Sequence, residues 1–182
     1  MPVCWSIPVP TCPSFTKLPS RMGTTWCWRS SSKGILWAFC SRTRSFLRRR
    51  RKKIVRQVCR ALWVLHSIGA VHRDVKPENI ILRGDNAVLI DFDAARFHKP
   101  ENSADTQILG TTGFAAPEQY GLSQSDIRTD IYALGVLINV MLTGEHPSRN
   151  LAKGRMGRIV DRCTHVNPQR RYKNVLRLME AL

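Results

Sequence analysis

The stretch V-H-R-D-V-K-P-E-N-I-I-L contains three polar side chains that could form part of a catalytic site. They are a carboxylate, an ammonium group and a carboxamide, at Asp74, Lys76 and Asn79, and a second carboxylate, Asp91, follows in L-I-D-F-D. Such oxygen atoms are the ligands that Mg²⁺ prefers, and a lysine beside them can stabilise moving negative charge. The set therefore suits a phosphorylated substrate, with Asp74 orienting a hydroxyl nucleophile.

A β-hairpin would bring these residues together. Ile80–Leu82 and Ala87–Ile90 are short runs of strand-forming residues on either side of the turn sequence G-D-N. In such a hairpin Asn79 and Asp91 lie at the same end, where their oxygens could share one cation. Asp74 would project toward that end from the preceding loop.

Helical spacing of apolar residues predicts the elements around the hairpin. The predicted helices cover Ile54 to about His66, Thr129 or Asp130 to Thr143, Arg158–Thr164 and Tyr172–Leu182. The polar stretch Asp91–Glu118 is predicted to be a loop. The longest apolar run, Ile131–Leu142, is too short to span a bilayer, so we expect no membrane segment and a cytoplasmic location.

Charge is distributed unevenly along the chain. Of the net charge of +16, the first 73 residues supply 15 Lys and Arg side chains and no acid. Residues 1–53 show no sustained period, and we predict a basic, irregular segment. Because composition changes abruptly where periodicity begins, translation in another reading frame, joined near Lys52, is the favoured origin. The alternative is a basic, aromatic-rich arm that binds nucleic acid through residues 42–53.

Four motifs in the remaining sequence resemble those of a known family. H-R-D-V-K-P-E-N is followed by D-F-D, by G-T-T-G-F-A-A-P-E and by D-I-Y-A-L-G, in that order. The set resembles the C-terminal lobe of eukaryotic-type Ser/Thr protein kinases, over residues 54–182. The resemblance implies an α+β, mostly α fold with a small β-hairpin. It also implies ATP-dependent, Mg²⁺-assisted transfer of phosphate to Ser or Thr of a protein substrate.

The resemblance assigns roles to the residues of the reaction. Asp74 would be the catalytic base, and Lys76 would contact the transferred phosphate. Asn79 and Asp91 would bind the metal, and together with Lys76 they would hold ATP.

Further residues have regulatory or structural roles by the same resemblance. Arg73 would receive a phosphorylated activation segment, Thr111 would contact the substrate, and Thr106 and Thr112 are candidate phosphorylation sites. The residues implied to be structural are Glu118 and Arg171, as an ion pair, and Asp130, which would brace the catalytic loop.

The sequence departs from the family pattern in three places. No G-x-G-x-x-G precedes the catalytic loop, and the first glutamate is Glu78, so the Lys–Glu pair of the family's N-terminal lobe cannot form. Asp93 replaces the glycine that follows D-F, which restricts that segment. Between Gly144 and Ile159 there is little room for the helix that the family places there.

The interpretation that follows is a kinase C-terminal lobe whose chain alone is catalytically impaired. One alternative is a non-catalytic, kinase-like module that binds or regulates a partner. The other is nucleic-acid binding through residues 42–53. Under the main interpretation we expect a protein substrate and do not expect nucleic acid as a partner.

Overall fold

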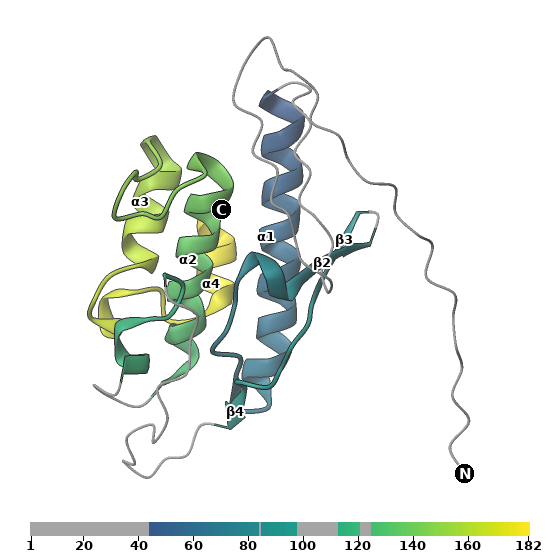
Figure 1. Ribbon diagram of the computed structural model, residues 1–182, viewed down its shortest axis with the longest axis vertical. Coiled ribbons are helices and arrows are strands. Elements are labelled where there is room, and N and C mark those ends of the chain that lie inside the picture. Colours follow the sequence, from purple (N-terminus) through teal and green to yellow (C-terminus); the bar gives the residue numbers. More distant parts are fainter. Residues whose placement is uncertain (1–43, 84, 98–112, 121–124) are drawn as a thin grey trace, which may run out of the picture.

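The computed structural model describes residues 44–83, 85–97, 113–120 and 125–182. Within these ranges the chain forms four α-helices and two pairs of short antiparallel strands (Figure 1). The predicted architecture, mostly α with a small β-hairpin, is therefore confirmed. No helix in the described ranges is both long and apolar enough to cross a membrane.

Helix α1, Arg44–Ser67, begins well ahead of Ile54, where the sequence pattern places its start. Arginine and lysine are good helix formers, and the stretch 44–53 contains no Gly or Pro. Its apolar period begins only at Ile54, because the described side chains ahead of that residue are basic and lie outside the core. The prediction of an irregular segment is thus wrong for 44–53, whereas residues 1–43 lie outside the described residues.

Helix α2, Ile127–Thr143, is the centre of the fold, and every residue from Thr129 to Asn139 except the half-buried Tyr132 is buried. It packs against α1 and against α3, Gly154–Cys163, while α4, Val175–Ala181, packs against α1. The helices supply most of the core, notably Val58, Leu62, Ile131, Leu134, Leu137, Val160, Cys163, Val175 and Leu178. A helix that is apolar all round has to lie inside a protein, which explains the place of α2.

The ends of α2 follow its sequence. The Asp126 side chain accepts a hydrogen bond from the Arg128 N–H at 2.7 Å, so the helix begins slightly before its predicted start. Gly144 ends it with φ of +80°, as predicted. Residues 145–153 contain no helix, in agreement with the limited room expected there.

Two strand pairs frame the loop with the polar cluster. Strands β2, Ile80–Arg83, and β3, Asn86–Leu89, form the predicted hairpin, with Ile80 opposite Leu89. The second pair, β1 (Ala70–Val71) with β4 (Arg96–Phe97), was not predicted. Two residues per strand are too few to show a period in the sequence.

Candidate active site

The loop His72–Asn79, called the central loop below, brings together the three polar side chains that open the sequence argument. Lys76 Nζ lies 2.6 Å from Asp74 Oδ2, and Asn79 Nδ2 donates to the same oxygen and to the Asp74 carbonyl, at 2.9 Å each. The side chains of Asp74 and Lys76 are 15% and 18% exposed. They are therefore accessible to a substrate but held in a fixed arrangement.

The hairpin places Asp91 beside this cluster. The Ile90 N–H donates to the Asn79 carbonyl at 2.9 Å, so the chain reaches Asp91 directly next to Asn79. Asp91 has φ of +64° and is exposed. An aspartate tolerates this left-handed conformation better than most residues do. The expected meeting of Asn79 and Asp91 at one end of the hairpin is observed.

The donor set at this end fits Mg²⁺. Both hydrogen bonds from the Asn79 amide group go to Asp74, so the amide oxygen faces away from Asp74 and can accept a cation. In the described part of the chain, no three His, Cys, Asp or Glu residues form a group that could hold a metal. A cation here would depend on the amide, Asp91, water and phosphate oxygens, which is how Mg²⁺ usually binds.

Asp130, at the start of α2, holds the backbone of the central loop. Its carboxylate oxygens accept the His72 N–H at 2.9 Å and the Arg73 N–H at 2.8 Å, and His66 Nε2 lies 2.8 Å from Oδ2. Asp130 is fully buried, so these donors replace the water it would otherwise bind. Arg73 has φ of +69°, a strained conformation that the two backbone hydrogen bonds help to maintain.

A second buried anchor lies behind the loop. Arg171 donates to both oxygens of Glu118, at 2.7 and 2.8 Å, and the Thr129 hydroxyl donates to Glu118 at 2.9 Å. Arg171 also donates to three backbone carbonyls, those of Arg128, His165 and Val166. The ion pair thus joins the segment 113–120 to the start of α2 and to the chain before α4.

Sequence reasoning missed two residues of this arrangement. Gln119 donates to the Arg73 carbonyl at 2.8 Å and accepts from the Ala116 N–H, which ties segment 113–120 to the central loop. His72 is fully buried, and its ring lies 5.0 Å from that of Phe92. Nothing in the sequence spacing indicates a role for Gln119. The position of His72 directly before Arg73 and Asp74 could have indicated that it belongs to this site.

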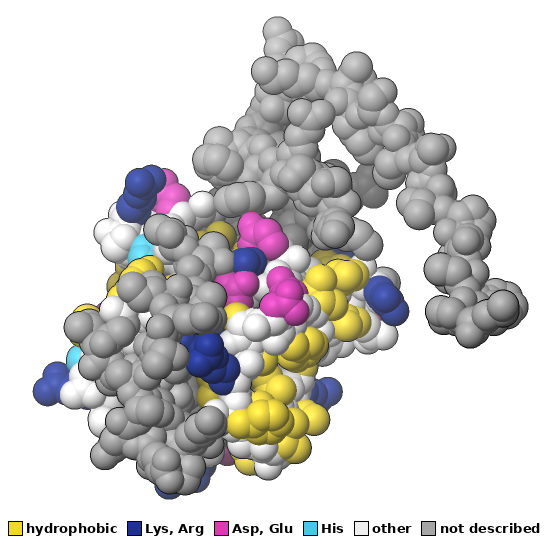
Figure 2. Space-filling view, turned by 60° about the horizontal axis from the view of Figure 1, so that its bottom comes forward, with side chains coloured by type: hydrophobic (Ala, Val, Ile, Leu, Met, Phe, Trp, Pro, Cys, Tyr) yellow, Lys and Arg dark blue, Asp and Glu magenta, His cyan; other side chains and the backbone are white. Residues whose placement is uncertain are grey.

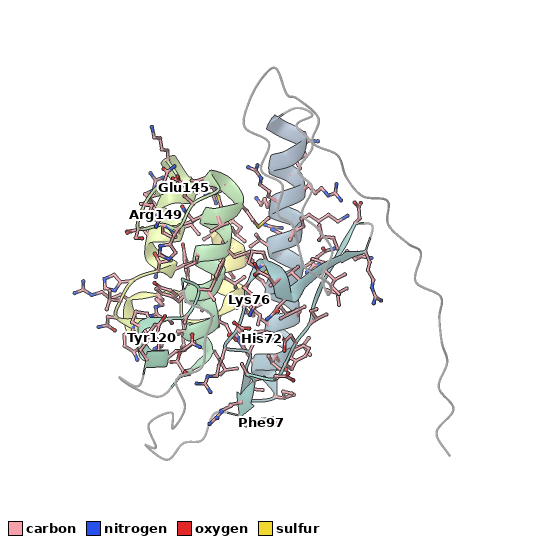
Figure 3. All side chains as sticks on the ribbon, in the orientation of Figure 1. His72, Lys76, Phe97, Tyr120, Glu145 and Arg149 are labelled. Carbon is pink, nitrogen blue, oxygen red and sulfur yellow. The ribbon has the colours of Figure 1, made fainter. Side chains whose placement is uncertain are left out.

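One face of the molecule carries mixed charge. Figure 2 shows acidic side chains gathered about a basic one, next to an apolar area. In Figure 3 the labelled Lys76 and His72 lie between the ribbons of α1 and α2. The cluster is reached from the surface through the partly exposed side chains of Asp74 and Lys76.

The sequence also singled out three threonines, Arg73 and Asp93. Thr106, Thr111 and Thr112 lie outside the described residues. Arg73 is 2% exposed, so its side chain lies within the protein. Asp93 has no positive φ, and its N–H donates to Asp91 Oδ1 at 3.5 Å.

Comparison with family models identifies the fold. The model described as "Protein kinase domain" matches residues 26–179. The chain belongs to the protein kinase family. The kinase match begins upstream of Ile54 and so includes part of the segment predicted to be irregular.

Curated kinases are similar over about half of the chain. Serine/threonine-protein kinase PknB of Mycolicibacterium smegmatis is 40% identical over 103 residues, which cover 54% of this chain and 16% of that protein. PknB of Mycobacterium leprae is 40% identical over 98 residues, or 52% of this chain and 16% of that kinase. PknL of Mycobacterium tuberculosis is 42% identical over 96 residues, which cover 52% of this chain and 24% of that kinase. The chain thus matches only a small part of each relative's length.

Proposed function

We propose that the chain carries the phosphoryl-transfer half of a protein serine/threonine kinase. The observation that supports this best is the contact of Lys76 and Asn79 with one oxygen of Asp74. In the proposed reaction Asp74 accepts the proton of a Ser or Thr hydroxyl, and Lys76 stabilises charge on the transferred phosphate. Asn79 and Asp91 would hold Mg²⁺, which neutralises phosphate charge when bound.

The chain alone is proposed to be catalytically impaired. Family kinases hold ATP with a glycine-rich loop and a Lys–Glu ion pair in the N-terminal lobe. This sequence contains no G-x-G-x-x-G, and no glutamate precedes Glu78. Under this proposal the chain carries the groups that would act on the reacting phosphate, whereas its sequence lacks these two motifs that would hold the nucleotide.

A phosphate-transfer assay tests this proposal. Purified chain, radiolabelled ATP, Mg²⁺ and a generic Ser/Thr protein substrate are compared with the Asp74→Asn variant. We expect transfer from both proteins to stay at the background level. Robust transfer that disappears in Asp74→Asn would refute the impairment but support the role of Asp74.

The second candidate is a non-catalytic module that binds or regulates a partner. It is favoured by the contrast between a fully braced central loop and the missing nucleotide-holding motifs. Calorimetric titration with Mg²⁺–ATP distinguishes the two. If the chain is a kinase lobe, we expect a small heat of Mg²⁺–ATP binding that disappears in Asp91→Asn. If it is a non-catalytic module, we expect no heat of binding.

A further inference from the structure

The solvent face of α1 carries a line of cations that the proposed phosphoryl transfer does not use. The exposed side chains on this face recur three or four positions apart, so they lie along one side of the helix. We call them the basic stripe: Arg49, Lys52, Lys53, Arg56 and Arg60. Trp63, 40% exposed, continues the same face at one end of the stripe.

The stripe has little internal charge compensation. Helix α1 contains no Asp or Glu. Among the described residues, the stripe's one salt bridge joins Lys53 to Asp85 at 2.9 Å, where both side chains are largely exposed. Cations four residues apart repel one another, and cations near a helix N-terminus oppose the helix dipole. A polyanion along this face would relieve both effects.

The burial of α1 argues against a membrane as that polyanion. An amphipathic helix that binds a membrane inserts its apolar face between lipids. Here the apolar face, with Ile54, Val55, Val58 and Leu62, is at most 3% exposed because it forms the protein core. The exposed surface of α1 is mainly cationic, with Trp63 and Val64 as its exposed large apolar side chains near the C-terminal end. In Figure 1 the N-terminal part of α1 extends beyond the hairpin.

We propose that the basic stripe and Trp63 bind single-stranded nucleic acid. Arg49 to Trp63 spans about 21 Å of helix, enough to follow several nucleotides. Cations that track phosphates, together with an exposed aromatic ring on which a base can stack, are the two elements of such sites. The sequence pattern alone did not favour this partner, because the abrupt change of composition favoured an origin in another reading frame. The structure places Arg49, Lys52 and Lys53 on one helix face with Arg56, Arg60 and Trp63.

Fluorescence anisotropy of a labelled oligothymidylate of about twenty nucleotides tests the proposal with the full chain. Arg56→Gln/Arg60→Gln is compared with Arg158→Gln/Arg170→Gln, which removes two exposed arginines elsewhere. We expect the stripe variant to bind about tenfold more weakly at low salt. Its plot of log affinity against log salt should be shallower by about 1.4, since each lost phosphate contact contributes about 0.7. Equal binding by both double variants would overturn the proposal and point to residues 1–43.

Trp63→Leu tests the stacking element separately. It should weaken binding about fivefold to tenfold without changing the salt dependence, because it removes a ring and no charge. An unchanged affinity, or equal competition by polyglutamate of the same charge, would show a general polyanion site and refute the proposal. Binding to phosphatidylserine vesicles without oligonucleotide binding would refute it as well. If Trp63→Leu fails to fold, as judged by circular dichroism, the arginine variants and the competitor decide.

Discussion

At the scale of single residues, the Glu118–Arg171 ion pair should be the most costly contact to break. Both side chains are almost fully buried, at 4% and 0% exposure, and among the described residues Arg171 forms no salt bridge with another acid. Glu118→Gln would leave a buried guanidinium without its counter-charge, which typically costs about 3–5 kcal/mol. We expect a loss of this size in the free energy of unfolding, measured by urea denaturation.

The matched control for Glu118→Gln is Glu180→Gln. Glu180 pairs with Arg177 at 2.8 Å, but those side chains are 63% and 67% exposed. Exposed pairs contribute little, so the control should change stability by less than about 0.5 kcal/mol. Similar losses for the two variants would mean that burial does not determine the strength of the Glu118–Arg171 pair.

The buried thiols of Cys59 and Cys163 predict a dependence of stability on alkaline pH. Burial raises the pKa of Cys59 to about 12, and burial is also the main cause of the raised pKa of Cys163. In the unfolded chain a thiol has a pKa of about 8.5. Between pH 8.5 and 12 the unfolded state therefore binds fewer protons, and the free energy of unfolding falls as pH rises.

Urea denaturation at pH 8, 9 and 10 measures this effect by comparing the original chain with Cys59→Ala. Tyrosines with raised pKa, Tyr132 and Tyr172, titrate in both proteins, so their contribution cancels. Cys59→Ala should be less stable than the original chain at pH 8. Its free energy of unfolding should then fall less steeply as pH rises, and the two slopes should differ by up to about 1.4 kcal/mol per pH unit. Parallel pH dependences would show that Cys59 ionises as readily in the folded state as in the unfolded state.

The sequence could predict which polar residues would come together in the site, but only some of the contacts that hold the central loop in place. Asp74, Lys76, Asn79 and Asp91 were found from residue type and from hairpin geometry. Gln119 was not found, because its contact with the Arg73 carbonyl depends on how segment 113–120 packs against the central loop. Contacts between segments far apart in sequence leave no periodic signal.

At the scale of elements, the closeness of α2 and α3 depends on Gly135. A Cβ added there would lie 2.4 Å from the Cβ of Cys163 and 2.9 Å from Thr164 Cγ2, so the two helices would have to separate. Gly135→Ala should destabilise the fold by about 1–3 kcal/mol, although alanine favours a helix by about 1 kcal/mol. Gly135→Ser should cost more. Thermal or urea unfolding measures both.

Gly69 is the control for Gly135, because Gly69 is required by its backbone conformation and not by close packing. An added Cβ there meets no atom within 4 Å, but φ is +76°. Gly69→Ala should cost about 1–2 kcal/mol from left-handed strain, and Gly69→Asn should recover part of it. If Gly135→Ser proved no worse than Gly135→Ala, steric separation of the helices would not be the cause.

Element boundaries show where sequence patterns stop being informative. The stop of α2 at Gly144 was predicted because a left-handed C-terminal residue favours glycine. The start of α1 was misplaced because the described side chains of 49–53 are all basic, so the part of the helix before Ile54 shows no apolar period there. A boundary defined by a cap is thus easier to predict than one within a charged run.

At the scale of the whole molecule, the described core predicts that residues 44–182 fold without the preceding segment. The core cluster found among the described residues begins at Ile54 and ends at Leu182, and it includes all four helices. Under the interpretation that the preceding segment does not belong to the fold, removing residues 1–43 should leave the free energy of unfolding unchanged within about 0.5 kcal/mol. The urea m-value should also stay the same, since it scales with the surface exposed on unfolding.

Two truncations locate any part of the N-terminal segment that does contribute. The kinase-family match begins at residue 26, so removing 1–25 and removing 1–43 differ by the matched stretch 26–43. Equal stabilities and equal m-values for both truncations would agree with a segment that adds nothing to the fold. If only the longer truncation lowered the m-value and lost more than about 2 kcal/mol, residues 26–43 would bury apolar surface against the lobe. The origin in another reading frame would then be wrong for that stretch.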